Sequence, residues 1–390
     1  MSALPRDRIY TDNRQYPSPM YENTRPYDDA EVPEVIRFMA SHAGFPLMVK
    51  LSHPDTTADA YREEFLKIKT VREFQQTMSI PFLNLVLANT SKGVSVRGLD
   101  LLDGETCRMY IGNHRDIVLD AAILMKTLAE HGMDTPEITF GSNLMQGDLV
   151  TAIGKINKMF RIVRGGNIRD FYKNSIEVSG YMRHALLEKK QSVWIAQRNG
   201  RTKDGDDHTE LGVLKMFALS SKKPFVENIE ELCITPLSVS YEYEPCDFLK
   251  TQELFVSRYQ QYIKSEGEDM ASIMQGVNQP KGRITLTVCP AITREELEEC
   301  DAFDKNDKYL QLAHIIDRRI FAGYQLYPTN YVAHDLLSGR NRWKHRYTAT
   351  ERAEFEDYMM RGLSALKGDA DELREIFLGI YARPVDNCAV

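Results

Sequence analysis

The chain has 390 residues, of which 43% are hydrophobic and 27% charged, so it can bury a large core and is not a disordered protein by composition. Its net charge of −7 argues against nucleic acid as the main partner, because phosphate binding needs a broadly basic surface. The six cysteines form no Cys-x-x-Cys pair and the histidines show no ligand spacing. We therefore expect reduced thiols in a cytoplasmic protein, without a metal site.

The first 30 residues are rich in Pro, Tyr and Asn and lack the apolar core of a signal peptide. They predict an extended arm and no secretion. The most apolar early run, IPFLNLVLA at 80–88, is about half as long as the ~20 residues that a membrane-spanning helix needs. Any membrane contact is therefore expected from one side, at the inner face.

From residue 31 to residue 89 the apolar residues recur at helical spacing, as in the run YREEFLKIKTVREFQQTM at 61–78. Short β-branched runs then alternate with helical stretches, which predicts an α/β fold. The predicted strands lie within CRMYIGN (107–113), EITFGSN (137–143), FRIVRGG (160–166), SVWIAQRNG (192–200), LCITPLSVSYEY (232–243) and RITLTVCP (283–290).

Helical patterns occupy 119–132, 144–160, 168–190 and 209–221 between these strands, and 293–300, 308–326 and 350–368 after them. We predict a mixed sheet flanked by helices. The expected organisation is an N-terminal arm and helical segment (1–104), an α/β domain (105–300) and a helical C-terminal extension (301–390).

Polar residues follow the predicted strands, where ligands bind in α/β sheets. The sequence NHRDIVLD at 113–120 places His114 after a buried strand, with Asp116 and Asp120 close behind it. A His with a nearby carboxylate, and no Ser or Cys nucleophile motif, indicates a general base that activates a substrate hydroxyl. The alternative is an ordinary helix start, in which Asp116 caps the helix and His114 is solvated.

Four blocks in this order resemble the glycerolipid acyltransferases, a family that includes bacterial glycerol-3-phosphate and 1-acylglycerol-3-phosphate acyltransferases. NHRDIVLD resembles the family's His and Asp with four residues between them. FRIVR supplies an Arg after an apolar strand. AQRNGRTKDG is similar to the family's glycine- and arginine-containing third block, and ITPLSVSYEYEP is close to its fourth.

The resemblance implies an enzyme in which His114 takes a proton from an acceptor hydroxyl, which then attacks an acyl-CoA or acyl carrier protein thioester. This thioester is a co-substrate, and no cofactor is implied. The acceptor implied is a glycerol phosphate or lysophospholipid in phospholipid synthesis, at a peripheral membrane position. The residues implied to bind substrate are Asn113, Arg164, Asn199, Gly200, Arg201, Thr202 and Lys203.

Two features depart from the family pattern. Five residues separate His114 from Asp120, one more than usual, so both Asp116 and Asp120 are candidates for the catalytic acid. The apolar helix that follows favours Asp120, provided that His114 lies before the helix. Asn199 stands where the family most often has Glu, which indicates either reduced activity or an acceptor other than glycerol phosphate, such as an amino-acid lipid hydroxyl.

Three other functions stay open at this point: acyl transfer to another lipid such as an aminolipid, hydrolysis of a thioester or phosphoester, and lipid binding without catalysis. Separately, SGRNRWKHRY at 338–347 gathers basic residues around a Trp. Such a run is either a solvated face or a contact for anionic lipid heads or an acidic carrier protein.

Overall fold

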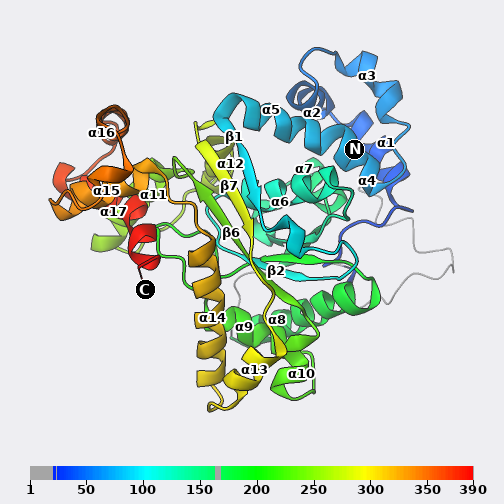
Figure 1. Ribbon diagram of the computed structural model, residues 1–390. Helices are drawn as coiled ribbons and strands as arrows, with labels where there is room; N and C mark the ends of the chain where they lie inside the picture. Colours follow the sequence, from blue (N-terminus) through cyan, green and yellow to red (C-terminus); the bar gives the residue numbers. More distant parts are fainter. Residues whose placement is uncertain (1–20, 23, 163–167, 390) are drawn as a thin grey trace. The chain divides into compact units, whose positions relative to one another are not determined.

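The computed structural model describes residues 21–22, 24–162 and 168–389 (Figure 1). It confirms the α/β fold: seven strands form a sheet in the order β1-β7-β6-β2-β5-β3-β4. β6 and β7 are antiparallel, whereas β1 pairs in parallel with β7, β2 with β6, and β3 with both β4 and β5. The strands are β1 (Ser91–Arg97), β2 (Met109–Gly112), β3 (Glu137–Gly141), β4 (Met159–Ile162), β5 (Val193–Ala196), β6 (Ile234–Tyr241) and β7 (Gly282–Val288).

Six of these strands coincide with the apolar runs that predicted them: four lie within their runs, and β4 and β7 each begin one residue earlier. β1 was not predicted: its residues SKGVSVR include only two β-branched apolar side chains and are exposed or half-buried throughout. An edge strand of this kind carries little hydrophobic signal, because only one neighbour, β7, holds it in the sheet.

The chain divides into two compact units. Unit 1 comprises the described residues of Met1–Leu85, Met125–Trp194 and Ala218–Lys222. Its apolar core includes contacts of Phe65 with both Phe45 and Phe74. Its helices are α1 (Val32–Ser41), α2 (Phe45–Ser52), α3 (Ala58–Phe65), α4 (Val71–Phe74), α7 (Asp148–Ile156) and α8 (Ile168–Arg183), with π-helical turns at Gln75–Ser79 and His184–Glu188.

The helical spacing over 61–78 does not belong to one helix. α3 ends at Phe65, and α4 begins after Thr70, whose side chain accepts a hydrogen bond from Glu73 N while the Glu73 side chain accepts from the Thr70 N–H. This capping box starts a new helix in the middle of the periodic run.

Unit 2 comprises Val86–Leu124, Ile195–Phe217 and the described residues of Lys223–Val390. Phe355, Phe377 and Tyr381 are central to the core of its C-terminal helices. Its helices are α9 (Leu211–Ala218), α10 (Phe225–Glu230), α11 (Asp247–Tyr259), α12 (Glu268–Asn278), α13 (Arg294–Asp301), α14 (Asp307–Gly323), α15 (Pro328–Ser338), α16 (Ala349–Leu363) and α17 (Ala370–Asn387). Two further helices, α5 (Ile80–Thr90) and α6 (Leu119–Glu130), have residues in both units, as does α9, whose last residue, Ala218, belongs to unit 1.

A buried carboxyl group joins several elements of unit 2. Asp247 is fully buried at the start of α11 and accepts hydrogen bonds from Tyr358 (2.9 Å), Tyr381 (2.7 Å) and Gln279 Nε2 (2.9 Å). Burial raises the pKa of Asp247 to about 6, although these hydrogen bonds oppose the shift.

This raised pKa predicts a pH-dependent contribution to stability. Between about pH 4 and pH 6 the folded protein binds a proton at Asp247 that the unfolded chain has released. The stabilising contribution is therefore complete below about pH 4 and is lost as the pH rises through about 6. We expect the free energy of unfolding of the wild type, relative to Asp247→Asn, to fall over this range and then level off. Urea unfolding at several pH values measures it, and a constant difference between the two proteins would contradict it.

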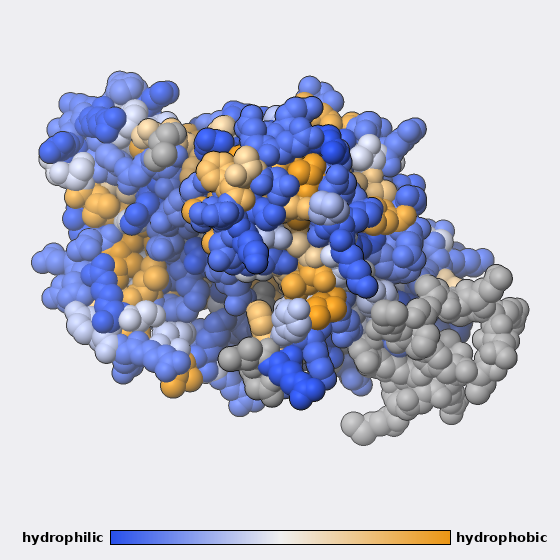
Figure 2. Space-filling model, turned by 90° about the horizontal axis from the view of Figure 1, so that it is seen from below, coloured by the Kyte–Doolittle hydropathy of each residue, from blue (hydrophilic) through white to orange (hydrophobic). Residues whose placement is uncertain are grey.

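No helix among the described residues is both long enough and apolar enough to cross a membrane. On the face shown in Figure 2, hydrophobic residues form separate patches between hydrophilic ones. The apolar run at 80–88 lies in α5, where Leu83, Val86 and Leu87 are buried. Packing in the protein core therefore accounts for these three apolar residues of the run.

Candidate active site

The site begins at the carboxyl end of β2, all four of whose residues are buried. Asn113 follows, and its side-chain amide continues the pairing with β6: Nδ2 donates to the Val239 carbonyl oxygen (3.0 Å), and Oδ1 accepts from Val239 N (2.8 Å). Nδ2 also donates to Asp207 (3.0 Å). Asn113 thus acts as a peptide group would, and fixes the point at which the chain leaves the sheet.

His114 comes next, before α6 begins at Leu119. Its Nδ1 lies 2.8 Å from Oδ2 of Asp120 in the first turn of α6. The Asp120 side chain is only 2% exposed, and the His114 side chain 13%. A carboxylate only accepts, so Nδ1 carries the hydrogen and Nε2 is the basic nitrogen of the ring.

Three further donors hold the Asp120 carboxylate. Oδ2 also accepts from the backbone N–H groups of Arg115 (2.6 Å) and Asp116 (2.9 Å), and Oδ1 accepts from the hydroxyl of Tyr241 on β6 (2.7 Å). A carboxylate fixed at both oxygens sets the position and the tautomer of the imidazole that it contacts.

Asp116 occupies a different position in the same turn. Its Oδ1 accepts from the backbone N–H groups of Val118 (2.9 Å) and Leu119 (2.8 Å) at the start of α6. Burial, and then the nearby charge of Asp120, raise the pKa of Asp116. Asp116 therefore caps the turn that leads into α6, and Asp120 is the carboxylate bonded to His114.

The hydroxyl of Tyr241 yields a stability prediction. Burial, followed by the charges of Asp120 and Asp116, raises the pKa of Tyr241 well above its usual value, so its hydroxyl keeps its proton and donates it to Asp120. Tyr241→Phe leaves Asp120 Oδ1 buried without this donor, and we expect the free energy of unfolding to fall by about 1–3 kcal/mol. Urea denaturation measures this change.

Tyr110→Phe is the matched control for Tyr241→Phe. Tyr110 is a buried tyrosine on β2, and within the described ranges its hydroxyl has no hydrogen-bond partner. We expect its loss to change stability much less, and equal losses in the two variants would refute the role given to the Tyr241 hydroxyl.

A buried ionic network lies on the other side of the His114 turn. The Arg115 guanidinium donates to Asp207 through Nε (3.1 Å) and Nη2 (2.5 Å), and to Glu244 through Nη1 (3.2 Å). Lys250 Nζ donates to Glu244 (2.6 Å) and to the Arg115 carbonyl oxygen (2.8 Å), and the Tyr324 hydroxyl donates to Asp207 (2.6 Å). Two cations and two carboxylates therefore balance inside the protein.

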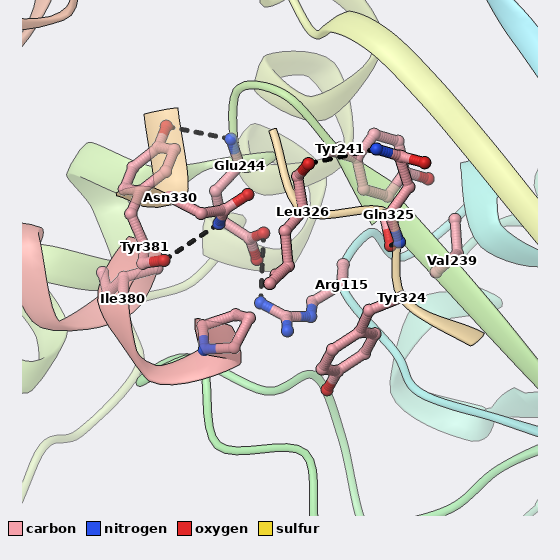
Figure 3. A pocket seen from close by; sticks show the side chains of 12 residues that line it. Arg115, Val239, Tyr241, Glu244, Tyr324, Gln325, Leu326, Asn330, Ile380 and Tyr381 are labelled. Carbon is pink, nitrogen blue, oxygen red and sulfur yellow. Dashed lines mark hydrogen bonds and ion pairs between the residues drawn. The ribbon is translucent and has the colours of Figure 1, made fainter. Parts of the chain in front are cut away.

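A pocket opens beside this network (Figure 3). The pocket lining includes Arg115 and Glu244, together with Tyr241 at the end of β6, Gln325 between α14 and α15, and Tyr381 of α17. The charge of Arg115 is already neutralised by Glu244 and Asp207, so the pocket is no ready anion site.

The third sequence block follows β5 and lies against the His114 turn, since Thr202 N donates to the His114 carbonyl oxygen (2.8 Å). Gly200 has a φ of +81°, a conformation that suits glycine. The Arg201 Nη1 atom is buried without a hydrogen-bond partner in the described part of the chain, whereas Lys203 forms an ion pair with Glu253. The N–H of exposed Asn199 donates to Glu210 (3.1 Å).

The structure thus brings Asn113, His114, Asp116, Asp120 and Thr202 together in unit 2. Arg164 lies outside the described residues. Within the ranges that the structure describes, no group of His, Cys, Asp or Glu residues is placed to hold a metal ion.

Sequence reasoning missed four residues of the network: Asp207, Glu244, Lys250 and Tyr324. Asp207 and Glu244 lie 92 and 129 residues along the chain from Arg115, so no local pattern links them to it. The available signal was weak: carboxylates and tyrosines in segments that follow strands.

Comparison with known proteins gives a structural similarity alone. No protein-family model matches the chain, and no curated protein matches it. Among solved structures, it is similar to the 1-acyl-sn-glycerophosphate (LPA) acyltransferase PlsC from Thermotoga maritima, with a TM-score of 0.36 and 12% sequence identity. That match covers 76% of this chain and 95% of the other.

Proposed function

We propose that this protein is an O-acyltransferase, which moves a fatty acyl group from an acyl thioester to the hydroxyl of a glycerol-phosphate or lysophospholipid acceptor. The observation that carries the proposal is the pair of His114 Nδ1 and Asp120 Oδ2 at 2.8 Å, at the carboxyl end of a buried strand. The four sequence blocks that resemble the glycerolipid acyltransferases support it.

In the proposed reaction, His114 Nε2 takes the proton of the acceptor hydroxyl while that oxygen attacks the thioester carbonyl carbon. The imidazolium that forms lies against the carboxylate of Asp120, which stabilises its charge. The carbon–sulfur bond then breaks, and the proton passes from His114 to the leaving thiolate. An ester and a free thiol result, and the enzyme regains its starting protonation state.

The acceptor phosphate is proposed to bind at the third block. Arg201 offers a guanidinium nitrogen without a hydrogen-bond partner among the described residues, and positive charge there suits a phosphate. Lys203 contributes a second cation after its ion pair with Glu253 is shared or opened. The acyl donor would be acyl-CoA or acyl carrier protein, and the acceptors place the enzyme at the inner membrane face.

The proposal is tested by measuring thiol release from a long-chain acyl-CoA and from an acyl carrier protein thioester. Each donor is assayed with glycerol 3-phosphate, with lysophosphatidate and without an acceptor, for the wild type and for His114→Ala. We expect release that needs an acceptor and that falls by about 10²–10⁴-fold in His114→Ala.

The other outcomes separate the alternative functions. Equal release with and without acceptor, lost in His114→Ala, would indicate a hydrolase. Release that requires an aminolipid acceptor would indicate another acceptor class, consistent with Asn199 in place of Glu. Release that His114→Ala leaves unchanged would overturn the mechanism, and no release from any donor would indicate a lipid-binding protein.

A further inference from the structure

The basic turn, residues 340–346 between α15 and α16, has unusual surroundings for a surface charge cluster. It contains Arg340, Arg342, Lys344 and Arg346, all exposed. Within the described ranges, no carboxylate lies within ion-pair distance of any of these four side chains, whereas most other cations of the C-terminal helices have one. The chain as a whole is acidic, with a net charge of −7.

The turn is held in one conformation by a carboxylate that neutralises none of its cations. Asp335 is buried in α15 and accepts hydrogen bonds from Trp343 N at Oδ1 (3.1 Å) and Oδ2 (3.0 Å), and from the Tyr347 hydroxyl (2.8 Å). Both oxygens are thus used to fix the backbone and a tyrosine. The cations of the turn are preorganised and keep their charge available for a partner.

Aromatic side chains underlie the cations. The Arg342 guanidinium lies 4.9 Å from the Trp343 ring centroid, and that of Arg346 lies 5.5 Å from the Tyr331 centroid. The Trp343 and Tyr331 rings are themselves 5.3 Å apart. Leu337, in the last turn of α15, is 42% exposed. Arginine above tryptophan, with an exposed leucine at the end of the preceding helix, is a combination suited to the boundary between lipid headgroups and acyl chains.

We propose that the basic turn binds the anionic headgroups of a phospholipid bilayer. An acidic protein partner fits less well, because a protein interface needs about 800 Å² on each side. Such a footprint would extend onto the start of α16, where Glu351 and Glu354 would repel acidic residues. Lipid headgroups move laterally and gather beneath a small cluster of cations without covering these carboxylates.

This proposal rests on the proposed function and deepens it by naming the surface that meets the membrane. Its test measures vesicle binding and does not depend on an assay of acyl transfer. Binding is measured by co-sedimentation with phosphatidylcholine vesicles, with and without phosphatidylglycerol. The test variant is Arg340→Gln/Arg342→Gln/Lys344→Gln/Arg346→Gln. The control, Lys222→Gln/Lys305→Gln/Lys367→Gln/Arg374→Gln, removes the same charge from exposed cations that also lack an ion-pair partner within the described ranges.

We expect the wild type to bind vesicles that contain phosphatidylglycerol, and this binding to weaken with salt. The test variant should lose at least about tenfold in affinity, whereas the control should lose much less. Equal losses in the two variants, or binding that does not depend on phosphatidylglycerol, would overturn the proposal. Binding of the wild-type turn to an acidic carrier protein but not to vesicles would also overturn it.

Tryptophan fluorescence provides a second readout of the same contact. The chain has two tryptophans, and Trp194 is buried in unit 1. In the Trp194→Phe variant the emission comes from Trp343, so we expect a blue shift, and quenching by brominated lipid, when anionic vesicles are added. Unchanged emission in the presence of bound vesicles would show that another surface makes the contact.

The two proposals fail in different ways. If the membrane proposal is wrong but the function is right, thiol release with glycerol 3-phosphate persists and vesicle binding does not depend on the basic turn. If the function is wrong but the membrane proposal is right, thiol release does not depend on both an acceptor and His114, whereas vesicle binding still depends on the basic turn.

Discussion

Replacing Asp120 with Asn is expected to lower acceptor-dependent thiol release by about 10²–10⁴-fold, the range for loss of an effective general base. The Asp120 carboxylate accepts from His114 Nδ1, from two backbone N–H groups and from the Tyr241 hydroxyl. An amide offers one acceptor oxygen in place of two, and it carries no charge to stabilise the imidazolium. In either orientation of the amide, its NH₂ group faces a group that donates to Asp120 in the wild type: the Tyr241 hydroxyl, or His114 Nδ1 and the two backbone N–H groups.

Asp116→Asn is the matched control, since it makes the same change four residues earlier. The amide oxygen of Asn can still accept from Val118 N and Leu119 N, which are the bonds that Asp116 Oδ1 makes. We expect less than about a tenfold loss, because Asp116 makes no bond to His114 in the structure. Steady-state rates of thiol release at saturating donor measure both variants. A larger loss in Asp116→Asn than in Asp120→Asn would exchange the roles assigned to them.

Asp207→Asn is expected to lower the free energy of unfolding by about 3–5 kcal/mol, the cost of breaking a buried ion pair from one side. Asp207 is fully buried, and its Oδ2 accepts from Asn113, from two nitrogens of Arg115 and from Tyr324. Burial alone would raise the pKa of Asp207, but the charge of Arg115 and the hydrogen bonds outweigh burial and lower it. The substitution leaves Arg115 buried with only Glu244 to balance it.

Two further variants test this explanation by urea denaturation. Asp304→Asn changes an exposed carboxylate without an ion-pair partner among the described residues, and should alter stability by no more than about 0.5 kcal/mol. Arg115→Met/Asp207→Leu removes both charges and should be more stable than Asp207→Asn. If the double variant is the less stable, the uncompensated charge is not the cause of the loss.

The lowered pKa of Asp207 also sets the pH dependence of this contribution. The ionised group stabilises the folded state fully above its unfolded pKa, near 4, and the contribution is lost as the pH falls below that value. We therefore expect the difference between the wild type and Asp207→Asn to shrink towards acid pH. Asp247 behaves in the opposite way, because its pKa is raised.

The sequence by itself determined the α/β class and six of the seven strands. Five of those strands, β2, β3, β5, β6 and β7, are largely apolar runs whose residues are buried in large part, so the hydrophobic pattern marks them locally. In β4 only Phe160 is buried. The sequence also placed His114 and both candidate carboxylates within seven residues of each other. It could not choose between Asp116 and Asp120 by spacing, because the answer depends on where the helix begins.

Only the tertiary structure decided which of the two carboxylates contacts His114. The chain leaves β2 in a non-helical turn and enters α6 only at Leu119, which brings Asp120 back beside His114 and leaves Asp116 as the cap. The structure also supplied Tyr241, Asp207 and Glu244, which meet this turn from positions about a hundred residues away. The formation of a strand or the start of a helix depends mainly on residues that are close together in the sequence, so a local pattern can predict it. The carboxylate and hydroxyl contacts that fix a catalytic histidine depend on which distant segments pack together, and that is settled only when the whole core forms.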